Sequence, residues 1–128
     1  MIYFFDNCIS YRLSDMLRAL GEDAESQRQS YPQDIADVDL FSQLAGRPGL
    51  VFISTDEKQK TRAEEARALK QSGISALYFG PFFRRKRFWE QAVWLMRRWE
   101  RIRGFAEGAA PGTFAEIKEN GRAWTFQL

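Results

Sequence analysis

The chain has 128 residues, of which 45% are hydrophobic and 28% are charged, and its formal net charge is +2. These values are typical of one soluble globular domain and exclude a disordered segment. The single cysteine excludes an internal disulfide, and the absence of histidine removes the commonest general base and transition-metal ligand. An early acidic residue and the lack of a long apolar stretch exclude a secretory signal and a membrane span. The expected compartment is therefore the cytoplasm.

The first half of the chain predicts strands alternating with helices. Residues 2–5 form a continuous apolar run, which is typical of a strand covered on both faces in a parallel sheet. Residues 12–20 carry apolar side chains at helical spacing and predict the first crossover helix. A weak strand is expected at residues 24–28, followed by a short helix at residues 38–45.

The second half continues the alternation. Residues 50–55 give the clearest buried strand, residues 61–71 a helix, and residues 74–80 a further strand. Residues 82–104 predict one long helix that ends at a glycine. The glycine-rich segment after it is expected to be a loop, and residues 122–128 an edge strand. Together these elements predict a three-layer α/β/α domain with a mostly parallel sheet, spanning residues 1–128 as a single domain.

Two of the predicted buried strands are followed at once by an aspartate, Asp6 after the first and Asp56 after residues 50–55. Ligands bind outside the carboxyl ends of the strands in such sheets, so we expect both side chains in one crevice, with Asp37 at a helix start within reach. Converging carboxylates without His or Cys favour a hard cation, Mg²⁺ or Mn²⁺, of the kind that assists phosphodiester cleavage. Each aspartate taken alone is equally well explained as a turn residue or a helix cap.

The predicted long helix is strongly basic. Residues 84–103 carry eight Lys or Arg against two Glu, and the densest cluster comprises Arg84, Arg85, Lys86 and Arg87. We expect this cluster either to contact RNA or a protein partner, or to be a solvated face. Helical spacing gives an inward stripe formed by Phe88, Ala92, Leu95, Trp99 and Ile102. By the same spacing Trp89 and Trp94 lie off the stripe, free to face a partner.

Four segments carry a family resemblance, in order and spacing. They are "FFDNCISYRLSDML", "YPQDIADVDLFSQL", "LVFISTDEKQKTRAEEARALKQSGISALYF" and "FWEQAVWLMRRWERI". They resemble the PIN-like domains of the VapC45-type toxins of bacterial type II toxin–antitoxin systems. The chain departs from the pattern at Ala36, where relatives tend to have proline, and at Cys8, where a small polar residue is expected.

The resemblance implies a PIN-like fold and a ribonuclease that depends on Mg²⁺ or Mn²⁺ and is inhibited by a cognate antitoxin protein. It implies RNA as the substrate and no membrane partner, and homodimers are a reasonable expectation for this kind of domain. By position it implies the catalytic acids Asp6, Asp37, Asp56 and Glu65, the first three as metal ligands. The accessory candidates are Asn7, Asp39 and Glu64.

Two other functions stay open from the residues alone. A non-catalytic module would bind RNA or protein through the arginine-rich helix and would have no use for converging aspartates. A receiver-like Mg²⁺-dependent phosphoacceptor would also place acids after its strands. It needs paired acids after the first strand, where this chain has Asn7, and a hydroxyl and a lysine that "LYFGPFF" does not offer.

Overall fold

A computed structural model describes the whole chain, residues 1–128. Its centre is a six-stranded sheet in the order β2-β1-β3-β4-β5-β6. The strands are β1 (Ile2–Phe5), β2 (Ala24–Ser26), β3 (Leu50–Ser54), β4 (Ser75–Phe79), β5 (Phe114–Ile117) and β6 (Ala123–Phe126). All neighbouring strands pair in parallel except β5 and β6, which pair antiparallel.

The strand order places a topological switch point between β1 and β3. From β1 the chain moves to β2 on one side, and it then returns to form β3 on the other side of β1. The connection after β1 leads to β2 and the connection after β3 leads to β4, in opposite directions along the sheet, which opens a crevice at the carboxyl ends of β1 and β3. This crevice lies where Asp6 and Asp56 follow their strands.

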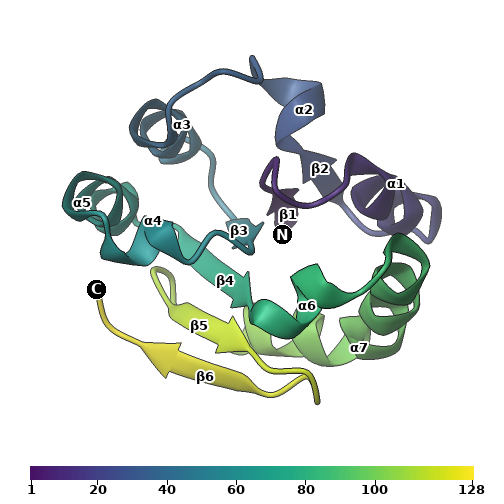
Figure 1. Cartoon of the computed structure of the whole chain (residues 1–128). Coiled ribbons are helices and arrows are strands. Elements are labelled where there is room, and N and C mark those ends of the chain that lie inside the picture. Colours follow the sequence, from purple (N-terminus) through teal and green to yellow (C-terminus); the bar gives the residue numbers. More distant parts are fainter.

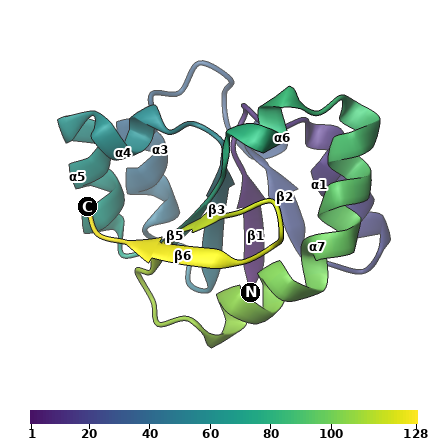
Figure 2. The ribbon, with the colours of Figure 1, turned by 60° about the horizontal axis from the view of Figure 1, so that its bottom comes forward.

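Helices cover both faces of the sheet, as Figure 1 and Figure 2 show. Helices α3, α4 and α5 lie on one face, and α1, α6 and α7 lie on the other. The helices are α1 (Tyr11–Ala19), α2 (Gln27–Ser30), α3 (Asp37–Leu44), α4 (Lys58–Thr61), α5 (Ala63–Ser72), α6 (Pro81–Arg85) and α7 (Phe88–Gly108). The predicted three-layer α/β/α fold class with a mostly parallel sheet is therefore confirmed. None of these helices combines the length and apolar character that a membrane crossing requires.

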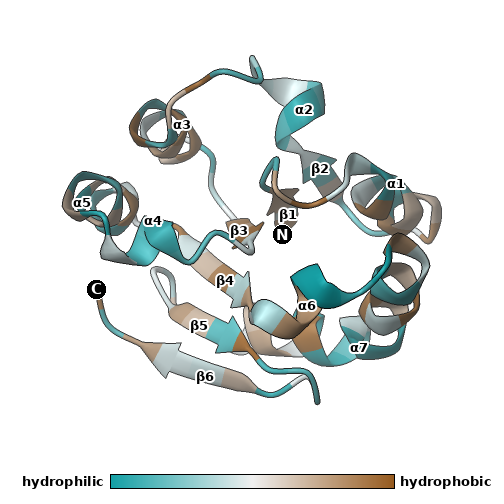
Figure 3. Cartoon of the chain, in the orientation of Figure 1, coloured by the Kyte–Doolittle hydropathy of each residue, from teal (hydrophilic) through white to brown (hydrophobic).

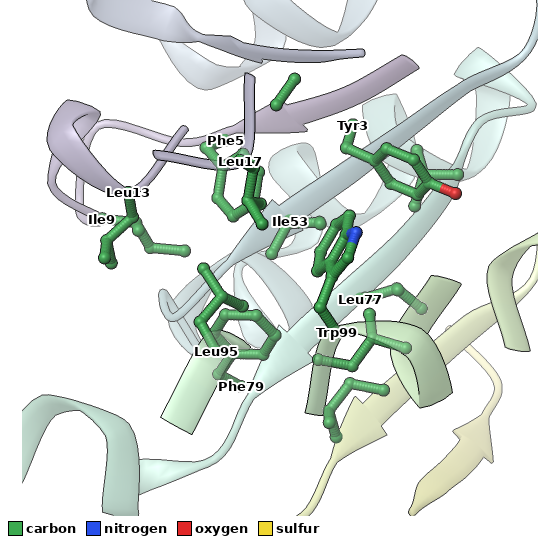
Figure 4. Close-up of a cluster of buried hydrophobic side chains, with 14 of the residues drawn as sticks. Tyr3, Phe5, Ile9, Leu13, Leu17, Ile53, Leu77, Phe79, Leu95 and Trp99 are labelled. Atoms are coloured by element: carbon green, nitrogen blue, oxygen red, sulfur yellow. The ribbon is translucent and has the colours of Figure 1, made fainter. Parts of the chain in front are cut away.

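Two hydrophobic cores result from the alternation of side chains along the strands. Tyr3 and Phe5 point to the face covered by α1 and α7, where they join Leu13, Leu95 and Trp99 in the first core (Figure 4). The intervening Phe4 points to the opposite core, which α3 and α5 cover with Leu40, Phe41, Leu44 and Leu69. Because each fully buried large apolar side chain contributes about 1.5–3 kcal/mol, both faces of β1 hold the strand in place.

Several elements of the secondary structure differ from the prediction. The strand expected at residues 24–28 ends at Ser26, and the short helix α2 follows it. A further short helix, α4, precedes α5. The tail expected as a loop contains the extra strand β5, because the four residues Phe114–Ile117 find pairing partners on both sides, in β4 and β6.

The long basic helix expected at residues 82–104 is two helices. Lys86 and Arg87 are extended between α6 and α7, and the backbone N–H of Arg87 donates to Glu90 Oε1 at 2.8 Å, which starts α7 anew. Gly104 does not end α7, which continues to Gly108. A single glycine within a helix held by packing costs only about 1 kcal/mol.

The break corrects two aromatic assignments. Phe88, expected in the core, is 41% exposed at the start of α7. Trp94, expected to face a partner, is only 6% exposed. Its indole packs against Phe79 and Phe83, and its Nε1–H donates to the carbonyl of Glu119 at 2.8 Å, so the burial leaves no unpaired donor. Trp99 is buried and Trp89 is 77% exposed, as predicted.

Candidate functional site

Asp6 is the most deeply placed of the predicted acids. It follows β1 at the switch point, where its backbone N–H donates to the carbonyl of Ile53 at 2.9 Å, and the residue is only 6% exposed. Its Oδ2 accepts hydrogen bonds from Ser54 Oγ at 2.7 Å and from Gln59 Nε2 at 3.1 Å. Its Oδ1 accepts from the backbone N–H of Asn7 at 2.8 Å. The carboxylate is thus held in one orientation by donors from three segments.

Asp37 joins the same network from the other side of the crevice. It is the first residue of α3, where the positive end of the helix dipole favours a carboxylate. Its Oδ2 accepts from Gln59 Nε2 at 3.0 Å, and this is the nitrogen that also donates to Asp6. One amide group therefore links the two carboxylates.

Gln59 is fully buried, and its orientation is fixed by a second contact. The hydroxyl of Tyr78, on β4, donates to Gln59 Oε1 at 3.2 Å, so the amide nitrogen must face the carboxylates. Sequence reasoning did not find Gln59. A glutamine between two lysines, in the stretch "DEKQKT", has the pattern of an exposed turn, and only the course of α4 over the crevice buries it.

The local electrostatics are those of crowded negative charge. Burial raises the pKa of Asp6, and the charge of Asp37 raises it further, while the hydrogen bond from Ser54 opposes the increase. Burial also raises the pKa of the Tyr78 hydroxyl, and the negative charges of Asp6, Asp56 and Asp37 add to this. The negative charges of all three aspartates therefore raise the pKa of the same Tyr78 hydroxyl.

Asp56 approaches this neighbourhood through Ser54. Its backbone N–H donates to Ser54 Oγ at 2.9 Å, the same oxygen that donates to Asp6. Its Oδ1 accepts from the backbone N–H of Lys58 at 3.0 Å, which is the turn role that the sequence had left open. As the side chains lie, no three or more Cys, Asp or Glu residues form a group that could hold a metal ion.

Cys8 lies beside Asp6, at the position where the chain departs from the family pattern. Although the residue is exposed, its Sγ turns inward, 3.5 Å from Asp6 Oδ2, and accepts from the backbone N–H of Thr55 at 3.3 Å. Burial and the charge of Asp6 raise the pKa of the thiol. The sulfur therefore stays protonated and acts as a weak donor to the carboxylate.

The remaining predicted acids lie outside the network. Asp39 and Glu64 are exposed. Glu65 pairs with Arg62 at 3.2 Å, has one buried carboxylate oxygen without a partner, and makes no hydrogen bond to the three aspartates. Asn7 supports the site through its backbone, while its side-chain amide donates to the carbonyl of Gln33 at 3.3 Å.

The basic cluster at residues 84–87 reaches the site through one member. Arg84 Nε donates to Thr55 Oγ1 at 3.1 Å, which places this side chain at the carboxyl end of β3. Lys86 pairs with Glu119 at 2.9 Å, and Arg85 and Arg87 are exposed and form no salt bridge. The end of α6 is correspondingly among the most hydrophilic parts of the ribbon in Figure 3.

The donor set suits a hard divalent cation. Its members near Asp6 are carboxylate and hydroxyl oxygens, which Mg²⁺ and Mn²⁺ prefer. The mutual repulsion of Asp6 and Asp37, visible in the raised pKa of Asp6, is relieved by any positive charge placed between them. The structure supplies an amide dipole at that place.

A comparison with protein-family models finds one match, to the family described as PIN like domain, over residues 1–80. The matched part contains Asp6, Asp37, Asp56 and Gln59, and with them the whole hydrogen-bonded network of the crevice. Nothing matches among the curated proteins or the solved structures.

Proposed function

Because the chain belongs to the PIN-like domain family, we propose that it is a metal-dependent endoribonuclease that cleaves RNA phosphodiesters. PIN domains are generally nucleases and generally use divalent metals, which supports a hydrolase acting on nucleic acid. Within that class we propose Mg²⁺ or Mn²⁺ as the ion and RNA as the substrate.

The observation that carries the proposal is the shared donor between Asp6 and Asp37. Two carboxylates from distant segments face one amide group in a buried crevice, at the place where open α/β sheets bind ligands. A network built only for stability would gain little from placing two like charges beside each other, since their mutual repulsion costs free energy. A cation bound between the two carboxylates would neutralise this repulsion, which explains the arrangement.

Asp6 and Asp37 would hold the ion, and Asp56 would join them by giving up its bond to the backbone N–H of Lys58. A bound Mg²⁺ or Mn²⁺ supplies stabilisation of the charge that builds on a phosphodiester during cleavage. Ser54 orients Asp6 and Asp56 from between them, and Arg84 offers a guanidinium to the substrate at the end of β3. We keep Glu65 as the fourth catalytic acid that the family resemblance implies; to act there it would have to leave its ion pair with Arg62.

We further propose that the protein is the toxin of a type II toxin–antitoxin system, acting in the cytoplasm. The support is the resemblance of the four quoted segments to VapC45-type toxins. An acidic segment of the antitoxin would find cations on Arg85 and Arg87, which have no acidic partner within the chain.

The test compares Asp6→Asn and Asp37→Asn with Asp34→Asn, an equal charge change at an exposed position shortly before the helix of Asp37. Each variant is assayed for Mn²⁺-dependent cleavage of RNA and, by calorimetry, for Mn²⁺ binding. We expect the first two to lose both properties and the control to keep both. Cleavage at the wild-type rate by Asp6→Asn would refute the proposed site.

One observation favours a non-catalytic binding module as the second candidate. The exposed ring of Trp89 lines a cavity of about 380 Å³ together with Arg97 and Arg98 on α7, which is suited to stacking and phosphate contacts. This function predicts that purified wild-type protein binds RNA but leaves it intact with Mg²⁺ or Mn²⁺. It also predicts that Trp89→Ala weakens binding while Asp6→Asn does not.

A further inference from the structure

A polar cavity of about 440 Å³ opens beside Asp6, on the side of the crevice nearest β2. The loop after β1, the start of α1 and the end of β2 come together there (Figure 1). Its walls include Ser10, Arg12, Ser26 and Arg28, and none of these residues belongs to the acidic network. The cavity therefore adds a basic compartment next to the acidic one.

Ser26 is an unsatisfied group in the wall of this cavity. The residue is only 2% exposed, and its hydroxyl has no hydrogen-bond partner. Although Ser26 precedes α2, its side chain makes no capping hydrogen bond to that helix. A buried hydroxyl without a partner is rare in folded proteins and needs an explanation, and a ligand that accepts its hydrogen bond provides one.

Arg12 and Arg28 leave their charges available. Neither guanidinium forms a salt bridge, and neither donates a hydrogen bond to any group of the protein. Each is instead held against an aromatic ring, Arg28 at 4.5 Å from the ring centre of Tyr11 and Arg12 at 5.8 Å from that of Phe88. Stacking fixes a guanidinium in place while its N–H groups stay free to bind an anion.

The start of α1 also favours an anion in this cavity. Ser10 caps this nine-residue helix, accepting from the backbone N–H of Arg12 at 3.3 Å, so the positive end of the helix dipole lies at the cavity. Backbone N–H groups at a helix start favour phosphate and other oxyanions. Asp6, the one acid in the wall, has both carboxylate oxygens already engaged by Ser54, Gln59 and Asn7.

We propose that this cavity is a phosphate subsite for the nucleic-acid strand. It holds a backbone phosphate next to the phosphodiester at Asp6 and Asp37, through Ser26 Oγ, the two arginines and the start of α1. The identity of the strand as RNA rests on the proposed function. The affinity for phosphate does not, because it follows from the wall of the cavity alone.

The test measures binding without cleavage. A short fluorescent 2′-O-methyl oligoribonucleotide is titrated in EDTA at several salt concentrations, with Arg12→Gln, Arg28→Gln and the double variant. Arg67→Gln is the control, because Arg67 is exposed on α5, unpaired, and changes the charge equally. Each lost phosphate contact to a single strand lowers the slope of log affinity against log salt by about 0.7, so we expect about 1.4 for the double variant and no change for the control.

Ser26→Ala separates a ligand contact from a structural one. It should weaken oligonucleotide binding without lowering the melting temperature, since the hydroxyl has no partner to lose. In the wild type, inorganic phosphate alone should shift the amide NMR signals of Ser26, Arg28 and Tyr11.

Equal affinity and equal salt slope for the double variant and Arg67→Gln would overturn the subsite. If the wild type nevertheless cleaves RNA, the nuclease proposal stands without it. Conversely, a wild-type protein that binds the oligonucleotide through Arg12 and Arg28 but cleaves nothing would keep the subsite and remove the nuclease.

Discussion

Asp6 and Asp37 share one hydrogen-bond donor, the Nε2 of Gln59, which lies 3.1 Å from one carboxylate and 3.0 Å from the other. The amide brings the positive end of a dipole to the point where two negative charges meet. A cation bound at that point would stabilise the same pair of charges more strongly than the Gln59 amide does. Two of our predictions follow from this relationship.

Replacing Gln59 by glutamate should convert the pair of carboxylates into a triad. In the absence of metal the added charge repels the other two, so we expect a lower free energy of unfolding than in the wild type. Added Mn²⁺ should recover more stability in Gln59→Glu than in the wild type, because ion binding to the native state stabilises it. Urea unfolding with and without Mn²⁺ measures both effects.

The matched control is Gln71→Glu, an equal change at an exposed position of α5. It should alter stability by less than about 0.5 kcal/mol, with no dependence on Mn²⁺. If Mn²⁺ stabilises Gln59→Glu no more than this control, the crevice is not a cation site.

The stability of the metal-free protein should depend on pH through Asp6. Burial and Asp37 raise its pKa in the folded state above the unfolded value of about 3.9. Between these two pKa values the folded state binds more protons than the unfolded state, so the free energy of unfolding falls as pH rises through that window. Above the folded-state pKa of Asp6, the free energy of unfolding falls no further from this group.

Asp6→Asn removes this titration and should give a flatter pH profile of urea midpoints from about pH 4 upward. The difference between the two proteins isolates Asp6, because Glu25, whose pKa Arg47 lowers, titrates alike in both. Parallel profiles would show that the pKa of Asp6 is not raised in the folded protein.

Asp56 can be tested for its two roles separately. Asn forms the same kind of side-chain turn, so Asp56→Asn should keep the bond to the Lys58 backbone N–H and change stability by less than about 0.5 kcal/mol. Asp56→Ala loses this hydrogen bond and should cost about 1 kcal/mol. If Asp56 is a metal ligand, both variants lose Mn²⁺-dependent cleavage. Cleavage retained by Asp56→Asn and reduced only in Asp56→Ala would leave Asp56 as a turn residue alone.

Much of the fold could be predicted from the sequence, because buried parallel strands are recognisable as continuous apolar runs. The apolar runs at β1, β3 and β4 predicted the sheet. The aspartates after β1 and β3 predicted that the candidate site lies at the carboxyl ends of the strands. The rest depended on tertiary context. Strand β5 exists because β4 and β6 flank it, and the break before α7 depends on a capping bond from Arg87 to Glu90.

Only the acidic residues of the site could be predicted from the sequence. Acids at the ends of apolar strands are easy to recognise in a sequence. Gln59 and Ser26 are important because they are buried, and their polar sequence neighbours give no indication of that burial. The same holds for Arg12 and Arg28, whose freedom from ion pairs is a property of the folded surface.

The corrected faces of α7 predict contrasting effects of two tryptophans. Trp99→Ala should destabilise the protein by about 3–5 kcal/mol, because its indole is buried against Tyr3 and Phe5. Trp89→Ala should change stability by less than about 0.5 kcal/mol, because the ring is exposed. Guanidinium unfolding of both variants gives the comparison, and equal losses would contradict the orientation of the helix.

The contact between Tyr3 and Trp99, with ring centres 4.8 Å apart, joins the opening strand to a helix that begins after the family match has ended. The family match ends at residue 80, yet a later helix packs behind the strand that leads into Asp6. The proposed metal ligands and part of the packing that supports them therefore come from different portions of the chain. A fragment that ends at residue 80 would contain Asp6, Asp37 and Asp56 and would still lack the helix that holds β1 in position.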